Sequence, residues 1–355
     1  MSEAVIHTSI LFMTPSAIAP PLLSWYDQFK RDLPWRAKDG KQPDPYRVWL
    51  SEVMLQQTTV AAVAPRFNRF IDRWPRVEVL AAAPDEDVMA EWAGLGYYAR
   101  ARNLLKCART VAKEHGGRFP DTEELLRMLP GVGAYTAAAI AAIAFNQPSS
   151  PVDGNIERVA SRLFRIETPL PAAKKEIKTA AAAMTPAERP GDFAQALMDL
   201  GATVCLPRHP RCTACPLVNL CEARKSNLES VLPIKPVKQA KPTRTGQAYW
   251  VENSRGDVLL RRRKQNGLLG GMIEIPSFGW SSDDAPKAVK ELTDHWTEVR
   301  PINHVFTHFR LELKIFCGRT DKDAIKNCFW APVDRLTSVG LPSVMKKVAE
   351  ASISA

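Results

Sequence analysis

The sequence predicts a mainly α-helical N-terminal part followed by a smaller α+β domain. Apolar residues recur at helical spacing from about residue 22 to residue 204, and no strand-like alternation interrupts them. A stretch rich in lysine and proline then indicates a semi-extended linker. Beyond this linker the hydrophobic period changes to two, which is typical of strands. The expected segments are a flexible extension (1–20), a helical domain (21–226), the linker (227–244) and the α+β domain (245–355).

Composition and charge narrow the class of protein. A chain of 355 residues that is 45% hydrophobic can bury sizeable cores in two or three domains. The net charge of +10 indicates an anionic partner, although some basic proteins bind nothing acidic. No apolar run is long enough to span a membrane, and no basic region precedes the apolar residues 10–12. We therefore expect a cytoplasmic protein that does not bind membranes.

Glycine and proline divide the helical part into segments. Two of these segments flank a turn at 129–136, where Gly131 and Gly133 allow backbone angles that other residues resist. A glycine turn that opens a helix presents unpaired N–H groups, the usual means of holding a phosphate. An ordinary corner between two helices would have the same pattern. Helices are expected at 22–31, 45–57, 59–73, 86–93, 99–115, 121–128, 137–145, 155–164 and 193–204.

Glu52 is a candidate for a carboxyl group with a raised pKa. Its neighbours one helical turn away include Val48, Trp49 and Leu55, so its face of the helix is largely apolar. Burial disfavours the charged form of a carboxyl group and raises its pKa. A glutamate that reaches out to water at the edge of an apolar stripe would fit the same pattern.

Asp153 precedes the helix expected at 155–164 and is well placed as its N-cap. Capping alone would explain an aspartate at this position. Capping does not exclude catalysis, because a carboxylate kept ionised by backbone N–H groups is also a fixed negative charge.

Residues 94–102 form a loop with two glycines, two tyrosines and two arginines. A flexible backbone, stacking rings and guanidinium groups that pair with phosphate are suited to insertion into a nucleic-acid duplex. Tyrosines packed in a core beside surface arginines would give the same composition.

Four of the seven cysteines lie close together near the end of the helical part. They are Cys205, Cys212, Cys215 and Cys221. Four thiolates at this spacing can enclose one metal or cluster site, and they indicate a reducing compartment rather than a secreted disulfide framework. Zinc and an iron–sulfur cluster both suit four cysteines, and the spacing alone does not choose between them.

The turn at 129–136, the residues 152–155 and the cysteine loop together resemble the helix-hairpin-helix DNA glycosylases. The whole chain resembles the MutY family of adenine DNA glycosylases, with the likeness running from about residue 22 to residue 315. This resemblance implies a two-module helix-hairpin-helix domain. It also implies a [4Fe–4S] cluster on the four cysteines, whose spacing matches that of MutY and endonuclease III.

The resemblance implies roles for two carboxyl groups. Glu52 matches the general acid, which protonates a ring nitrogen of adenine so that the N-glycosidic bond breaks. Asp153 matches the carboxylate that opposes the developing positive charge on the sugar. Tyr135 and Asn155 match positions that support these two. Tyr135 also stands where lyases of the endonuclease III type carry a Schiff-base lysine, so we expect a monofunctional glycosylase.

Further residues are assigned by the same resemblance. Those expected to line the adenine pocket are Leu33, Trp35, Arg36 and Gln195. Those expected to contact DNA are Gln56, Gln57, Thr58, Leu95, Gly96, Tyr97, Arg100, Gly131, Val132, Gly133, Arg208 and His209. The expected partner is double-stranded DNA with adenine opposite 8-oxoguanine or guanine, bound by a monomer.

The C-terminal domain resembles the MutT-like (Nudix-fold) domain of the family, most clearly at 267–276. The following segment, 277–296, lacks the acidic cluster of the Nudix hydrolases, so nucleotide hydrolysis is not expected. The triplet that recognises 8-oxoguanine in the family, Phe-Ser-His, stands here as Phe306, Thr307 and His308. On a regular strand Thr307 would face away from its two neighbours, so the triplet must lie in a turn or bulge to act together.

Two other functions remain open from the sequence. One is a pyrimidine glycosylase and lyase of the endonuclease III type, which Tyr135 and the extra domain disfavour. The other is a non-catalytic protein that binds lesions through the helical turn and the cluster. The resemblance favours a base excision repair enzyme that removes adenine and is associated with the bacterial nucleoid.

Overall fold

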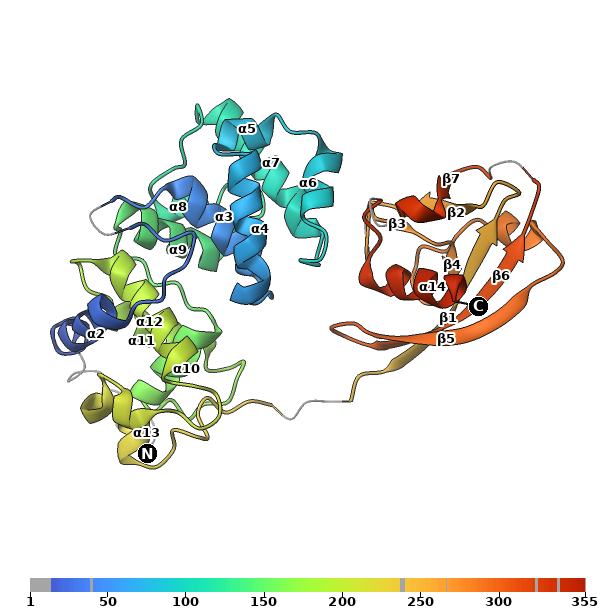
Figure 1. The fold of residues 1–355 in the computed structure, drawn as a ribbon. Helices are drawn as coiled ribbons and strands as arrows, with labels where there is room; N and C mark the ends of the chain where they lie inside the picture. Colours follow the sequence, from blue (N-terminus) through green and yellow to red (C-terminus); the bar gives the residue numbers. More distant parts are fainter. Residues whose placement is uncertain are drawn as a thin grey trace. The chain divides into compact units, whose positions relative to one another are not determined.

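The computed structural model describes residues 14–38, 41–236, 240–265, 267–322, 325–336 and 339–354. The chain divides into two compact units, Met1–Ala82 with Asn103–Val237 and Ala83–Arg102 with Lys238–Ala355. The first unit is helical and the second contains a β-sheet, as Figure 1 shows. The expected combination of a helical part and an α+β part is therefore confirmed.

The helices that precede the sheet in the chain are joined by turns and loops of different lengths. The segments expected from the sequence are present, and the described residues of this part contain three further helices that were not expected, α5, α11 and α13. Across the described ranges, no helix is both long and apolar enough to cross a membrane. The helices are α2 (Pro15–Phe29), α3 (Pro45–Leu55), α4 (Val60–Arg73), α5 (Val77–Ala81), α6 (Asp85–Glu91), α7 (Ala99–Glu114), α8 (Glu123–Leu126), α9 (Ala134–Phe145), α10 (Gly154–Leu163), α11 (Lys174–Met184), α12 (Pro190–Thr203) and α13 (Glu222–Lys225).

Helix α2 begins before the start expected from the sequence, which was near residue 22. Pro15 suits the first helical turn because its backbone N–H would have no partner there. Pro20 and Pro21 lie inside the helix, where each removes a backbone hydrogen bond. The buried side chains of Ile18 and Leu22 pack into the core of the first unit, and this burial offsets the loss. Residues 1–13 of the expected extension lie outside the described residues.

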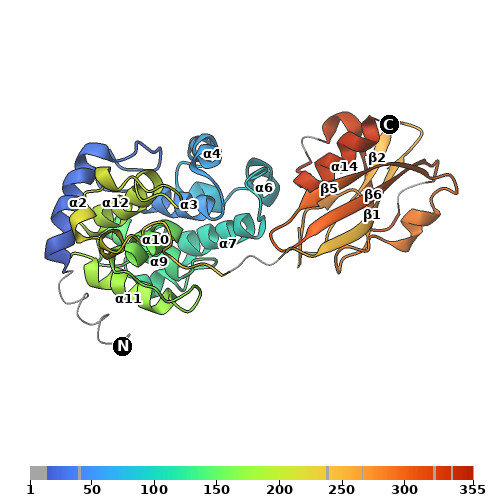
Figure 2. The ribbon, with the colours of Figure 1, turned by 90° about the horizontal axis from the view of Figure 1, so that it is seen from below.

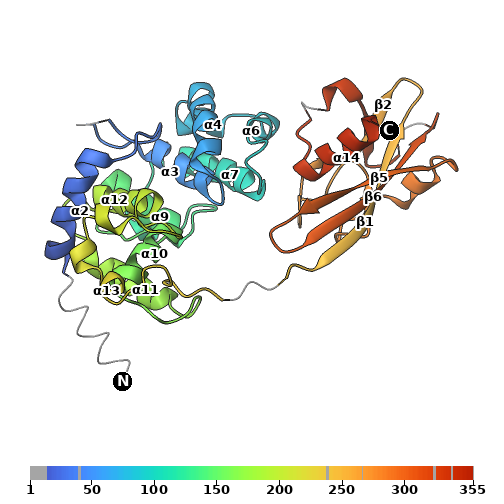
Figure 3. The same ribbon diagram turned by 60° about the horizontal axis from the view of Figure 1, so that its bottom comes forward.

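Helix α12 packs against α2, α9 and α10, an arrangement visible in Figures 2 and 3. Two glycines of α12 permit this close approach. A Cβ atom on Gly191 would lie 2.5 Å from the carbonyl oxygen of Ala142, and one on Gly201 would lie 2.5 Å from Cβ of Asn155. The helix that carries Gln195 is therefore held tightly against the start of α10.

In the described part of the second unit, seven strands form one sheet in the order β3-β2-β1-β6-β5, with β4 beside β1 and β7 beside β2. Strands β1 and β6 run parallel and the other neighbours run antiparallel. The expected hairpin at 247–263 is formed by β1 and β2. The strands are β1 (Thr243–Glu252), β2 (Asp257–Arg262), β3 (Ile273–Glu274), β4 (Ser277–Phe278), β5 (Thr297–Val305), β6 (Arg310–Arg319) and β7 (Cys328–Pro332).

Helix α14 (Ser343–Ile353) covers one face of this sheet, as Figure 1 shows. Val344 and Val348 of α14 belong to the same buried cluster as Leu311 and Leu313 of β6. The residues that alternate with these on β6 are exposed, so the strand has the period of two that the sequence predicted. The other face of the sheet buries a second cluster around Tyr249.

Candidate active site

Glu52 is buried on α3, with only 6% of its surface exposed. The Asp44 side chain caps this helix by accepting from the backbone N–H of Tyr46, and the apolar stripe of the helix packs inward. Burial raises the pKa of Glu52 to about 7, while the hydrogen bond from Tyr135 lowers it and the negative charge of Asp153 raises it. Glu52 is therefore not a side chain that reaches out to water.

The Asp153 carboxylate caps α10, as the sequence predicted. One carboxylate oxygen, Oδ1, accepts from the backbone N–H groups of Asn155 at 2.9 Å and Ile156 at 2.7 Å. The other, Oδ2, accepts from the Asn155 side-chain amide at 2.9 Å. Three N–H donors from the first turn thus fix the direction of this carboxylate. Its charge acts on Glu52, which places the two carboxyl groups in one electrostatic site.

Arg158, which the sequence did not single out, holds Asn155 from the other side. It donates to the Asn155 amide oxygen at 3.0 Å and to the carbonyl oxygen of Gly201 at 2.6 Å. Its Nε donates to the carbonyl oxygen of Cys205 at 2.7 Å. One buried guanidinium group therefore connects the support of Asp153 to the first cysteine of the loop. The sequence feature that could have indicated this role is the position of an arginine on the apolar face of α10.

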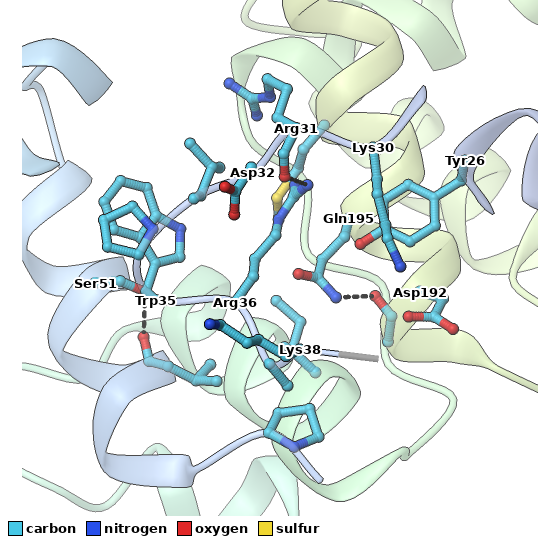
Figure 4. Close-up of a pocket in the computed structure, with 18 of the residues that line it drawn as sticks. Tyr26, Lys30, Arg31, Asp32, Trp35, Arg36, Lys38, Ser51, Asp192 and Gln195 are labelled. Carbon is cyan, nitrogen blue, oxygen red and sulfur yellow. Dashed lines mark hydrogen bonds between the residues drawn. The ribbon is translucent and has the colours of Figure 1, made fainter. Parts of the chain in front are cut away.

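A cavity of about 960 Å³ lies beside Glu52. The four residues expected to form the adenine pocket, which are Leu33, Trp35, Arg36 and Gln195, all line it together with Glu52. In Figure 4, Trp35 and Ser51 lie toward one side of the cavity and Tyr26 and Asp192 toward the other. Among the described residues that line this cavity, neither Tyr135 nor Asp153 appears, so Glu52 is the link between the carboxyl pair and the cavity.

The guanidinium group of Arg36 is held by Asp199 rather than left open to the cavity. Asp199 accepts two hydrogen bonds from Arg36, at 2.7 and 2.6 Å, and one from Nε of Arg31 at 2.6 Å. Asp199 is fully buried. Burial alone would raise the pKa of Asp199, but the two arginines hold it below its ordinary value. Asp199 was not expected from the sequence, in which it stands as a single acid between the buried Leu197 and Leu200.

The turn between α8 and α9 exposes backbone N–H groups. Gly131 has a φ of +76°, and Gly133 is the N-cap of α9 without any capping side chain. Val132 between them is 7% exposed, so its side chain belongs to the core, and its backbone N–H already donates to the carbonyl oxygen of Leu129 at 3.1 Å. Gln56 donates to the Thr136 hydroxyl at 3.2 Å, whereas Gln57 is exposed with a φ of +56°.

The loop at 94–102 differs from the expectation at two positions. Leu95 is only 4% exposed, because its apolar side chain packs into the interior instead of reaching outward. Arg100 lies over the rings of Trp92 and Tyr97 and donates to the carbonyl oxygens of Leu95 and Gly96, so it holds the loop together. Tyr97 is 48% exposed, and its hydroxyl forms a hydrogen bond of 2.5 Å with the Thr307 hydroxyl.

The four cysteines line one small cavity together with Arg162 and Glu229. Arg162 is buried and donates to Sγ of Cys205 at 3.2 Å, a contact that suits a thiolate ligand. Within the residues that the structure describes, no three cysteine, histidine or acidic side chains converge closely enough to hold a single metal ion. Arg208 and His209, the basic residues of this loop, are exposed.

The triplet at 306–308 lies in the turn between β5 and β6. The sequence required a turn or a bulge here for the three side chains to act together. The backbone N–H of Phe306 donates to the carbonyl oxygen of Phe309 at 2.9 Å and closes the turn. Thr307 and His308 are exposed, whereas Phe306 is half-buried and packs against the core of the second unit. The three side chains therefore do not share one face of the turn.

Comparison with known proteins adds to this geometry. The family described as the HhH-GPD superfamily of base excision DNA repair proteins matches residues 50–186, and the NUDIX domain matches residues 247–351. The human adenine DNA glycosylase is 35% identical over 400 residues, covering 94% of this chain and 73% of the relative. That of Buchnera aphidicola subsp. Baizongia pistaciae is 30% identical over 347 residues, covering 95% and 97%. A solved thermostable thymine-DNA glycosylase is 29% identical with a TM-score of 0.53, over 60% of this chain and 97% of that one.

Proposed function

The chain belongs to the adenine DNA glycosylase family of base excision repair, and we propose that it excises adenine paired with 8-oxoguanine or guanine in duplex DNA. The observation that carries the proposal is the buried carboxyl group of Glu52 at the wall of a cavity, within the electrostatic reach of Asp153. A proton donor and an anion so placed suit the hydrolysis of an N-glycosidic bond.

Glu52 is the general acid in this proposal. Adenine leaves poorly as an anion, so a ring nitrogen must gain a proton as the bond to the sugar breaks. A carboxyl group with a pKa of about 7 is protonated in about half of the molecules at neutral pH and can supply that proton. The Tyr135 hydroxyl holds Glu52 in one orientation toward the base.

Asp153 stabilises the oxocarbenium-like sugar that forms as the base departs. The three N–H donors that hold its carboxylate fix the negative charge before the reaction starts, so little reorganisation is needed in the transition state. Asn155 orients Oδ2 and is in turn held by Arg158.

The cavity receives the extruded base. Its wall includes the ring of Trp35 and the side-chain amide of Gln195, which suit the flat face and the hydrogen-bonding edge of adenine. Arg36 shapes the cavity through Asp199 rather than by a free guanidinium group. Extrusion has an unpairing cost of roughly a few kcal/mol, which is smallest at a mispair.

Duplex contacts are assigned to groups that the structure exposes. The backbone N–H groups at Gly131 and Gly133 suit a phosphate, and Tyr97 and Gln57 suit insertion beside the mispair. Arg208 and His209 add positive charge for a second backbone segment. Leu95 and Arg100 are left out of this set because the loop itself uses both side chains.

A [4Fe–4S] cluster is proposed for the cavity of Cys205, Cys212, Cys215 and Cys221. A cluster distributes its four thiolates over separate irons, whereas a single zinc ion needs four sulfur atoms about 2.3 Å from one centre. The four cysteines surround one cavity, and their spacing matches that of the cluster loop in the family that the chain resembles.

The domain limits proposed are a glycosylase domain at 21–226, a linker at 227–244 and a Nudix-like domain at 245–355. The matched ranges, 50–186 and 247–351, lie inside these limits. The exposed Thr307 and His308 in the turn after β5 would read the base opposite adenine. Thr307 retains the hydroxyl of the serine found in the family triplet.

Single-turnover release of adenine tests the function. A duplex with adenine opposite 8-oxoguanine is compared with duplexes that contain thymine glycol or a guanine:thymine pair, and only the first is expected to lose a base rapidly. Glu52→Gln is expected to bind the duplex but to release adenine about 10² to 10⁴ times more slowly, because its amide cannot donate the proton. A wild type that binds and releases nothing would favour a lesion-binding protein instead.

Tyr135 predicts that the N-glycosidic bond is cleaved while the DNA strand stays intact, because no amine stands at this position to form a Schiff base. Borohydride trapping of wild-type protein on its substrate checks this expectation. Efficient trapping, together with nicking at the rate of base release, would show that the enzyme is a lyase.

A further inference from the structure

Three aromatic rings and two guanidinium groups form a continuous stack beneath the turn at 306–309. The centroids of Trp280 and Phe306 are 5.8 Å apart with planes 15° from parallel, and those of Phe306 and Phe309 are 4.8 Å apart at 28°. Arg263 lies 5.0 Å from the centroid of Trp280, and Arg244 lies 4.2 Å from that of Phe309. Phe306 and Phe309 of the turn thus belong to a stack that continues through Trp280 into the core of the second unit.

Trp280 is the buried end of this ring stack. Only 2% of its surface is exposed, and its Nε1 donates to the Ser277 hydroxyl at 2.9 Å. Gly246 on β1 makes room for the ring, because a Cβ atom there would lie 2.8 Å from Cδ1 of Trp280. The hydrogen bond and the missing side chain together give the indole ring one position.

Arg263 cannot leave the face of Trp280 without breaking a buried network. It is 3% exposed, donates to Glu274 at 2.5 Å and donates to the Ser281 hydroxyl at 2.6 Å. Glu274 is also paired with Arg261. The stack thus has a fixed base, on which the position of Phe306 depends.

The turn presents two side chains to solvent while Phe306 anchors it. The carbonyl oxygen of Phe306 accepts from Nζ of Lys241 at 2.8 Å, and its N–H closes the turn on Phe309. Thr307 and His308 follow directly and are exposed. The anchored Phe306 therefore fixes the backbone from which these two side chains project, and the Thr307 hydroxyl also forms a hydrogen bond of 2.5 Å with the Tyr97 hydroxyl.

We propose that Trp280 is a positioning residue for recognition of the base opposite adenine: it holds Phe306 and so orders Thr307 and His308 before DNA binds. This inference rests on the proposed reading of that base by the turn. 8-Oxoguanine differs from guanine only by an added oxygen and a moved proton, so groups that distinguish the two must be held in place. Ordering a side chain only on binding reduces affinity, by roughly 0.5 to 1.5 kcal/mol for each side chain.

The test compares Trp280→Leu with Trp280→Phe in the full-length protein. The measured quantity is the ratio of duplex dissociation constants with guanine and with 8-oxoguanine opposite an uncleavable adenine analogue. Loss of the stacked ring in W280L is expected to lower this ratio about 2- to 10-fold. W280F keeps a flat ring against Phe306 and is expected to have the same ratio as the wild type. Trp296→Leu, which removes a ring that packs against Tyr249 instead, is expected to leave the ratio unchanged.

Each outcome of this test separates the inference from the function on which it rests. A wild type without preference for 8-oxoguanine would overturn the inference and the proposed reading of that base by the turn, but not the excision of adenine, which the single-turnover assay tests separately. A wild type that prefers 8-oxoguanine, with an equal preference in W280L, would overturn the role of Trp280 alone. Thermal unfolding shows whether W280L folds. If it does not, Trp280→Met fills part of the space without a ring, and an unchanged ratio in W280M would overturn the proposal.

Discussion

The Tyr135 hydroxyl donates a hydrogen bond of 2.8 Å to Oε2 of Glu52, and this bond opposes the effect of burial on the same carboxyl group. Burial favours the neutral acid, whereas a donor aimed at the carboxylate favours the anion. The balance raises the pKa of Glu52 to about 7. A proton is therefore available near neutral pH, although the side chain is well shielded from water.

Replacing Tyr135 by phenylalanine tests this balance. Without the hydroxyl, the pKa of Glu52 is expected to rise further by about half to one unit, the equivalent of one net hydrogen bond. Because the protonated form is the active one, the rate of base release falls as pH rises through this pKa. The single-turnover profile of Y135F should therefore extend to higher pH than that of the wild type. A profile displaced to lower pH would contradict the proposed role of Glu52 as the acid.

The same carboxyl group reduces the stability of the folded chain at alkaline pH. Its folded-state pKa of about 7 exceeds the ordinary value of 4.5, so the folded chain binds more protons than the unfolded chain between these values. The contribution of Glu52 to stability is therefore fully present below about pH 4.5 and is lost as pH rises through about 7.

Glu52→Gln removes this dependence on pH. At pH 8 to 9 the variant is expected to be more stable than the wild type by up to about 3 kcal/mol, and near pH 4 the advantage should vanish. Urea unfolding followed at both pH values measures the difference. An advantage of equal size at both values would show that the gain has another cause than the charge of the carboxylate.

The local features of the site could be predicted from the sequence because they depend on near neighbours. The burial of Glu52 follows from apolar residues one helical turn away, and the capping by Asp153 follows from its position before α10. The switch to a period of two predicted the strands of the second unit. Helix spacing and capping act over three or four residues, which a sequence displays directly.

The remaining features depend on contacts between distant segments. Asp199 pairs with Arg36 from 163 residues away, and periodicity does not show which buried acid meets which arginine. Leu95 was expected to reach DNA, but its loop packs the side chain inward. Arg158 likewise has partners on α12 and in the cysteine loop. Tertiary packing decides these positions, and no local pattern contains it.

Asp199→Asn is expected to destabilise the first unit and to distort the cavity. The change leaves Arg31 and Arg36 without a neutralising partner, and breaking a buried ion pair typically costs about 3 to 5 kcal/mol. The matched control is Asp192→Asn, on the same helix, whose pair with Arg189 is exposed and contributes about 0 to 1 kcal/mol. Urea unfolding compares the two variants. Equal losses would show that the burial of Asp199 has no energetic consequence.

Arg158→Met is expected to slow base release without preventing duplex binding. The variant keeps an apolar side chain of similar length, but it leaves the Asn155 amide oxygen and the carbonyl oxygens of Gly201 and Cys205 without their donor. An unpaired buried acceptor costs about 1 to 3 kcal/mol, so Asn155 should turn and release Oδ2 of Asp153. A loss of about 2 kcal/mol in the transition state corresponds to a rate about 30-fold lower.

The iron content of R158M separates two causes of a lower rate. If Arg158 acts through Asn155, the rate falls while the iron bound per chain stays at the wild-type level, because Arg162 still donates to Sγ of Cys205. If it acts mainly by holding the start of the cysteine loop, iron and rate fall together. Arg165→Met provides the control, since Arg165 is exposed and pairs with Glu167 and Ser226 at the surface. A rate equal to that of the wild type in R158M would remove Arg158 from the support of Asp153, whatever the iron content.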